Sequence, residues 1–361
     1  MRLVWGEVLE VEHERDGLQL LAVLPDGGPK GAAVCYPDLS GPCRKGDRVL
    51  LNTTAVDLGL GTGGRHFVVA RADTIDGVSF DSSSGGHIMK LRYSPLQRDV
   101  IAVESPESPH HAAMAEATTL AGMPVVCCGL HSQVPLVAAA AKQLGPTLRI
   151  AYCMTDSASL ALPLSDVVAA SVMAGLLDAT ISCGQSFGGQ LEAVNLHSGL
   201  LAARHAVDAD LAIVAIGPGV VGTATPFGHG GVAQGEAINA AAVLGGIPVA
   251  VLRLSFADTR DRHRVVSHHS LASLSQVALA QAIVAVPRLD GELAEQVDAA
   301  LESAGVWARH RRALAQVGGS PDMRGVDVTT MGRAEADDPA FFAAAYAAGE
   351  VAAGIALSPE R

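Results

Sequence analysis

The sequence predicts an α/β protein with a doubly wound, mostly parallel three-layer sheet domain over residues 86–361, preceded by a small β-rich domain over residues 1–85. Beyond Val100, short apolar runs alternate with helix-length runs, which is typical of parallel strands joined by helices. The runs Leu211 to Ile216 and Ile247 to Leu252 are continuous, as strands buried on both faces require. Residues 1–85 instead carry short β-rich runs between turns, which indicates a β-barrel or sandwich.

Gly- and Pro-containing turns separate the β-rich runs of the N-terminal domain, as they do in small barrels and sandwiches. The runs are Val4 to Glu12, Leu18 to Leu24, Gly31 to Tyr36, Arg48 to Asn52 and Arg65 to Ala70. The segment Asp81-Ser-Ser-Ser-Gly-Gly86 then predicts a linker, because Ser and Gly seldom continue a strand or a helix.

Apolar runs at regular spacing predict the parallel strands of the larger domain, and a helix-length run separates each from the next. The runs are Val100 to Glu104, Pro124 to Cys128, Leu148 to Met154, Ala179 to Cys183, Leu211 to Ile216, Ile247 to Leu252 and Ile283 to Val286. Roughly seven parallel strands that alternate with helices are typical of a doubly wound fold, with helices on both faces of the sheet. The sequence therefore predicts three layers.

The C-terminal segment departs from this alternation. Two short extended runs, Arg312 to Val317 and Val326 to Thr330, predict an added hairpin. Residues 338–353 predict an amphipathic helix that covers the domain and carries Phe341, Phe342 and Tyr346. An alternative use of these aromatic side chains is a helical interface in a homo-oligomer.

Composition and charge exclude several classes of protein. The net charge of -12 argues against a nucleic-acid surface, which needs clustered Lys and Arg. No apolar run reaches the roughly 20 residues that span a bilayer, and no signal-peptide core follows Met1. None of the cysteines forms a C-x-x-C pair, so no structural zinc site is indicated. We expect a cytoplasmic protein without membrane or nucleic-acid partners.

A glycine-rich loop follows the run Leu211 to Ile216, and it matches G-x-G-x-x-G at its start. The next helix does not open at the third glycine, and no acidic residue ends the following strand, so a dinucleotide fold is not favoured. We expect the loop and the helix start to bind an anion, with an irregular loop as the alternative. The anion-site residues would be Gly217, Gly219, Gly222, Thr223 and Gly230, with Arg260 and Arg262 from the next loop.

Ionisable side chains gather where the predicted strands end, and the carboxyl edge of such a sheet is where ligands bind. The candidate catalytic residues are His131, Asp156, His229, Asp258, His268 and His269. Adjacent helical residues point about 100° apart, so only one of the last two is expected to face the site. The alternative is a set of caps and a solvated ion-pair network.

Two chemistries fit such an edge. Histidine nitrogens and aspartate oxygens can hold a divalent metal ion for hydrolysis. Without a metal, His229 or His268 would transfer protons while Arg260 or Arg262 neutralises a small anionic ligand.

Four segments of the chain resemble a bacterial family of uncharacterised proteins that is classed as a domain of unknown function. The segments are Gly85 to Tyr93, Gly184 to Gly189, Gly217 to Gly231 and Asp258 to Ser270. The resemblance implies a bacterial protein of this architecture and brings no assigned activity or catalytic residues.

Two functions follow as hypotheses. The first is an enzyme of hydrolase or transferase type that acts on a small phosphate- or carboxylate-bearing molecule at the sheet edge. The second is a non-catalytic regulatory protein that binds a nucleotide or metabolite.

Overall fold

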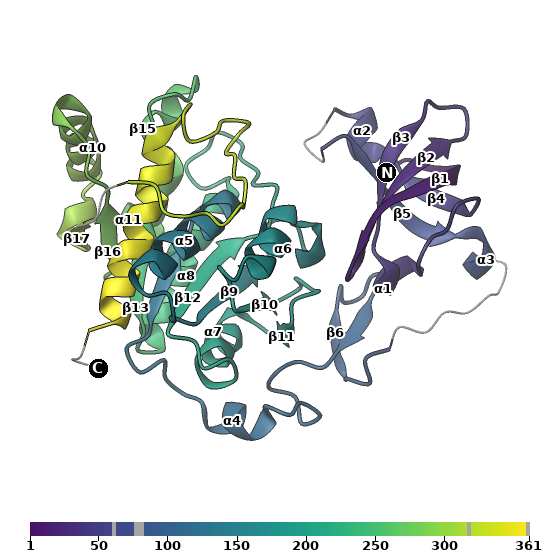
Figure 1. The fold of residues 1–361 in the computed structure, drawn as a ribbon, viewed down its shortest axis with the longest axis horizontal. Coiled ribbons are helices and arrows are strands. Elements are labelled where there is room, and N and C mark those ends of the chain that lie inside the picture. Colours follow the sequence, from purple (N-terminus) through teal and green to yellow (C-terminus); the bar gives the residue numbers. More distant parts are fainter. Residues whose placement is uncertain (60–62, 76–82, 316–318, 359–361) are drawn as a thin grey trace. The chain divides into compact units, whose positions relative to one another are not determined.

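The computed structural model describes residues 1–59, 63–75, 83–315 and 319–358, and the chain divides into two compact units (Figure 1). The first unit is Met1–Val100 and the second is Ile101–Arg361. The first unit extends past residue 85, the boundary expected from the sequence, because the hairpin of β6 (Ile88–Lys90) and β7 (Arg98–Val100) belongs to it. An ion pair of 2.8 Å between Arg98 and Asp38 ties this hairpin to the rest of the unit.

The first unit is built on a closed five-stranded barrel, which confirms the predicted β-rich domain. Its strand order is β1-β2-β3-β5-β4, and β4 pairs with β1 to close it. Each strand coincides with one of the runs expected from the sequence. The strands are β1 Leu3–Arg15, β2 Leu18–Pro25, β3 Gly31–Cys35, β4 Arg48–Asn52 and β5 Arg65–Arg71, with short helices α1 Pro37–Ser40, α2 Thr54–Asp57 and α3 Ala72–Ile75.

The second unit contains an eight-stranded sheet in which every neighbouring pair is parallel, so the predicted parallel sheet is confirmed. Its order is β11-β10-β9-β12-β8-β13-β16-β17. The strands are β8 Pro124–Cys127, β9 Ile150–Thr155, β10 Ala179–Cys183, β11 Leu191–Ala193, β12 Leu211–Ile216, β13 Ile247–Val251, β16 Ile283–Val286 and β17 Arg311–Leu314. All six residues of β12 are buried, as its continuous apolar run requires.

Helices cover both faces of this sheet and complete the three layers. One apolar core lies on the side of α5 (Val134–Leu144), α6 (Asp166–Met173) and α11 (Pro339–Ala356). The other lies on the side of α7 (Leu196–His205), α8 (Ala233–Val243) and α10 (Gly291–Ser303). The helices α5 and α11 pack side by side (Figure 1). Two shorter helices are α4 (His111–Glu116) and α9 (His268–Ala272).

Two strand predictions are wrong in detail. The run Val100 to Glu104 does not enter the large sheet as a strand, because Val100 ends β7 and Ala102 makes only an isolated bridge to Glu192. The expected C-terminal hairpin is absent from the described residues. Instead, β17 pairs in parallel with β16 and extends the sheet. This pairing gives hydrogen-bond partners to backbone groups of β16 that would otherwise be unpaired at the edge.

The C-terminal helix α11 covers the sheet, and its aromatic side chains face inwards. Phe341 and Phe342 are each 2% exposed and belong to the core on the α5 side. Among the described residues, α11 alone is long and apolar enough to cross a bilayer, but most of it is buried, so this is weak evidence for a membrane span. Its apolar composition is explained by packing within the second unit.

The order of the strands reverses direction between two neighbours of the sheet, β9 and β12. The chain leaves β9 towards β10 on one side, whereas it leaves the adjacent β12 towards β13 on the other. In open α/β sheets such a switch in direction marks where ligands bind. The two loops at this point touch, since Ser159 donates a backbone hydrogen bond to the Pro218 carbonyl at 3.0 Å. A side chain at Gly217 would lie 2.4 Å from the Ser159 oxygen, so only glycine fits.

Candidate functional site

Several of the predicted site residues fall into two groups that both border the glycine loop, Gly217 to Gly231. Gly217 and Gly219 line a pocket together with His131. Gly222 and Gly231 approach the rings of His229 and His269 instead. The site therefore has a pocket side and a histidine side, and we describe them in turn.

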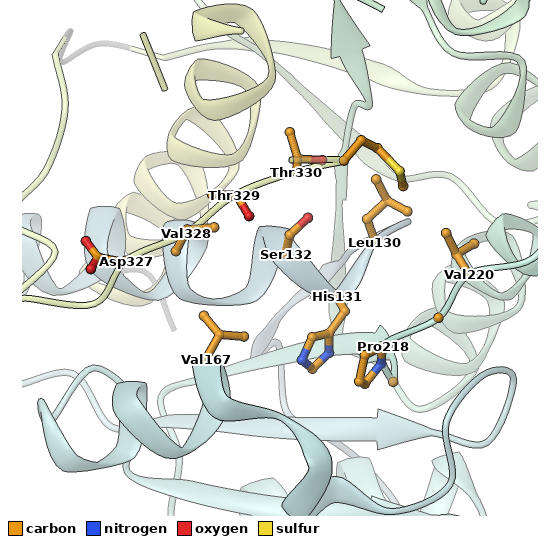
Figure 2. A pocket seen from close by; sticks show the side chains of 13 residues that line it. Leu130, His131, Ser132, Val167, Pro218, Val220, Asp327, Val328, Thr329 and Thr330 are labelled. Carbon is orange, nitrogen blue, oxygen red and sulfur yellow. The ribbon is translucent and has the colours of Figure 1, made fainter. Parts of the chain in front are cut away.

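The pocket has a volume of about 450 Å³ and lies at the carboxyl edge of β8 and β12. Figure 2 shows its walls, which come from the turn after β8, the start of α6, the glycine loop and a C-terminal segment. Its walls are formed by Leu130, His131, Ser132, Val167, Gly217 to Val220 and Asp327 to Met331. Apolar walls with a few hydroxyl groups are typical of small-molecule sites.

His131 is held in one tautomer by its hydrogen bonds. Its Nδ1 lies 3.2 Å from both the Ile216 carbonyl and the Tyr152 hydroxyl. The Tyr152 hydroxyl donates to the same carbonyl at 3.3 Å, and a carbonyl only accepts, so we place the imidazole proton on Nδ1. The Nε2 of His131 lies 2.7 Å from the Ser165 hydroxyl oxygen and accepts a hydrogen bond from that hydroxyl. Burial lowers the pKa of His131 to about 4, although the carbonyl of Ile216 opposes the shift. The imidazole is therefore neutral at pH 7.

Ser165 is a residue that the sequence reasoning did not identify as functional. It precedes α6, and its Oγ accepts a hydrogen bond from the Val168 backbone at 3.1 Å, so it is the N-cap of this helix. A serine before a helix indicates a cap, and nothing in the sequence relates it to a histidine 34 positions away. Only the fold brings the two together.

Four imidazole rings pack against one another on the other side of the glycine loop. His229 stacks on His269 with ring centres 3.9 Å apart, and His268 meets His229 edge-on at 5.2 Å. His263 completes the group, 4.9 Å from His269. One nitrogen from each of His229, His268 and His269 lies within 4.8 Å of the others.

Burial keeps these imidazoles neutral. It is the main cause of the lowered pKa of His263, to about 3, and of His269, to about 2, with the Arg253 guanidinium adding to both shifts. The pKa values of His229 and His268 are also lowered, again chiefly by burial. Neutral imidazoles offer lone pairs rather than positive charge.

Asp258 is the centre of an ion-pair network next to these rings. Its side chain is 2% exposed and accepts two hydrogen bonds from the Arg260 guanidinium, at 2.7 and 2.9 Å, and one from the Arg260 backbone at 3.0 Å. Arg253 and Arg333 lie 3.8 and 3.5 Å from the same carboxylate. The Arg260 hydrogen bond is the main reason why the pKa of Asp258 is far below its ordinary value. Asp258 and Arg260 thus bind each other. Arg262, the other predicted arginine, is exposed.

The other predicted residues are not brought into either group. Asp156 is exposed and accepts a hydrogen bond of 2.9 Å from the Gln185 backbone, so it fixes the turn after β10. The Thr223 hydroxyl donates to the Gly228 carbonyl at 3.0 Å within the glycine loop. Gly230 begins the short helical turn before α8.

Comparison with known proteins identifies the family and nothing further. No curated protein and no solved structure matches this chain. One family model, described as a protein of unknown function (DUF3866), matches residues 32–349. The match covers β4, β5 and nearly all of β3 in the barrel but neither β1 nor β2, and it covers nearly all of the larger unit. The chain therefore belongs to this family of proteins of unknown function.

Proposed function

We propose that the second unit is an enzyme of hydrolase or transferase type, and that its substrate is a small molecule with a carboxyl or phosphoryl group bound in the pocket. The observation that carries this proposal is the contact of 2.7 Å between Ser165 Oγ and His131 Nε2. His131 lines the pocket, and Ser165 lies behind it rather than among the lining residues. A hydroxyl within hydrogen-bond reach of an oriented neutral imidazole is the arrangement of an activated nucleophile.

In the proposed reaction, His131 is the general base. Its Nε2 takes the proton of Ser165 as the oxygen attacks the carbonyl carbon of a carboxyl ester or the phosphorus of a phosphoester. The leaving group then takes this proton, and water or an acceptor molecule releases the product from Ser165. The Ile216 carbonyl, which holds Nδ1–H at 3.2 Å, keeps the ring in the tautomer that this role needs.

The walls of the pocket support a substrate with little net charge. Among the described residues that line it, none is Lys or Arg, and Asp327 lies on the side opposite the glycine loop in Figure 2. The backbone N–H groups of Gly219 and Val220 donate to no group in the described part of the chain. They are therefore available to a carboxyl or phosphoryl oxygen.

A non-catalytic binding protein is the second candidate. It is favoured by the burial of Ser165, which is 4% exposed and caps α6. In that case the bond to His131 would only join α6 to the turn after β8, and the pocket would hold a metabolite without chemistry.

Turnover of chromogenic carboxyl esters and phosphoesters by the full chain separates these two functions. The variant Ser165→Asn keeps a side-chain oxygen for the cap and removes the hydroxyl, so it should fold and lose turnover by about 100-fold or more. His131→Gln should lose a similar factor. Unchanged turnover in a folded Ser165→Asn would contradict the proposal, and saturable thermal stabilisation without turnover would favour the binding protein.

A further inference from the structure

We propose that His229, His268 and His269 bind a divalent transition-metal ion. The proposal concerns the histidine side of the glycine loop and shares no residue with the Ser165–His131 pair. It therefore stands independently of the proposed reaction.

The hydrogen bonds of two histidines leave their lone pairs pointing to no partner. His229 Nε2 lies 3.0 Å from the Pro226 carbonyl, and His268 Nδ1 lies 3.2 Å from the Arg262 carbonyl. Because a carbonyl only accepts, both protons sit on these nitrogens. The remaining nitrogens, His229 Nδ1 and His268 Nε2, are buried and have no hydrogen-bond partner.

This pattern is the one that metal-binding histidines show. A ligating imidazole usually donates its second N–H to a carbonyl or carboxylate, which fixes the tautomer and orients the ring. A buried acceptor without a partner is otherwise unfavourable, because it has lost its hydration. His229 is 5% exposed, so water does not explain its free nitrogen easily. An ion between His229 and His268 would satisfy both.

The ring geometry assigns different roles to the three residues. The planes of His229 and His268 are inclined by 72°, so their lone pairs can converge on one point. His229 and His269 are stacked within 5°, and two parallel rings cannot hold one ion in both of their planes. His269 Nδ1 also accepts a bond of 3.3 Å from Arg253. His269 would thus turn to become the third ligand, after the first two have bound.

The distances permit such a site with a small contraction. Ligand nitrogens around tetrahedral zinc lie about 3.3 Å apart, given metal–nitrogen bonds of about 2.0–2.1 Å. The three histidines already have nitrogens within 4.8 Å of one another. Gly222 borders the same space, since a Cβ there would lie 3.5 Å from His229 Cβ and 3.6 Å from His269 Nε2.

The donor set selects the class of metal. Imidazole nitrogens suit Zn²⁺, Co²⁺, Ni²⁺ and Cu²⁺ rather than Mg²⁺ or Ca²⁺. Asp258, the nearby carboxylate, is occupied by its arginines and is not free to be a fourth ligand. A three-histidine site would leave one coordination position for water or substrate.

Titration of the full chain with Co²⁺ and Zn²⁺, after removal of any affinity tag and treatment with a chelator, tests the proposal. We expect one equivalent to bind and Co²⁺ to show visible absorption typical of nitrogen ligands. His229→Ala and His268→Ala should each weaken binding about 100-fold or more, and His269→Ala by a smaller factor. His197→Ala, which removes an exposed histidine of α7, should change nothing.

The outcomes separate this proposal from the one on Ser165. Ser165→Asn should bind the metal as the unaltered chain does, whether or not turnover is found. If the alanine variants do not fold, His229→Gln and His268→Gln keep a polar side chain and serve in their place. Absence of stoichiometric binding, or equal binding by the His229→Gln/His268→Gln double variant, would overturn the metal centre.

Discussion

Replacing Asp258 with Asn tests the network beside the histidines, because the change removes one charge and almost no volume. Asp258 and Arg253 have side chains that are only 2% and 5% exposed, and they lie 3.8 Å apart. Arg253 would remain buried with no carboxylate within ion-pair distance among the described residues. Removing one partner of a buried pair costs about 3–5 kcal/mol. Since Arg260 is 39% exposed and can rehydrate, we expect the lower end, about 3 kcal/mol.

The expected loss is large enough to measure by thermal unfolding. For a unit of this size, about 3 kcal/mol lowers the midpoint temperature by about 6–12 °C. Trp5 lies in the first unit and Trp307 in the second, so a Trp5→Phe background lets tryptophan fluorescence report on the second unit alone.

Asp298→Asn is the matched control. Asp298 pairs with Arg312 at 3.0 Å, but both side chains are about 40% exposed, at 38% and 40%. Exposed pairs contribute less than about 1 kcal/mol. If Asp258→Asn lowers the midpoint no more than Asp298→Asn does, the network is not a buried one and our reasoning is refuted.

Three further predictions concern the pocket and the core. His131 has a pKa of about 4 in the folded chain, below its unfolded value, so it contributes stability above about pH 6.5 that is lost as the pH falls towards 4. In urea unfolding, the free energy of unfolding of His131→Gln should therefore fall by about 3 kcal/mol less over this pH range than that of the unaltered chain. An equal fall in both would contradict the burial of this ring. Gly217→Ala should destabilise the chain by about 1–3 kcal/mol in the same assay, because the new methyl group would lie 2.4 Å from the Ser159 backbone oxygen. Gly354→Ala, in an open part of α11, is the control and should be neutral or stabilising. Equal effects of the two variants would argue against the contact between the loops. Phe341→Ala should lower the free energy of unfolding by about 3–5 kcal/mol by calorimetry, because this side chain is 2% exposed. Phe227→Ala should lower it much less, because that side chain is 56% exposed. A small loss of stability in both variants would refute the core position of α11.

Much of the fold could be predicted because burial on both faces leaves a direct mark on the sequence. The continuous apolar run of β12 is an example. The barrel could be predicted for a different reason, because turn residues separate its short β-rich runs. The edges of the sheet could not be predicted. Arg311–Leu314 carries two arginines and pairs in parallel with β16, and such pairing is decided by tertiary neighbours rather than by local preference.

The candidate site was only partly predictable for a similar reason. Loops that follow parallel strands share one edge, so the meeting of His229 with His268 and His269 follows from chain order and topology. Which groups neutralise one another is a matter of side-chain geometry. Arg260 folds back on Asp258, and Ser165 reaches His131 from another helix; neither contact leaves a signal in the sequence.

The most direct test of the proposed activity is mass spectrometry of the full chain after reaction with a fluorophosphonate. In this reaction the serine oxygen bonds to phosphorus, fluoride departs, and His131 takes the proton. We predict that the peptide containing Ser165 gains the phosphonyl group, and that Ser165→Asn and His131→Gln abolish or strongly slow the labelling. A folded chain that remains unlabelled at Ser165 would contradict the account and leave the pocket as a binding site alone.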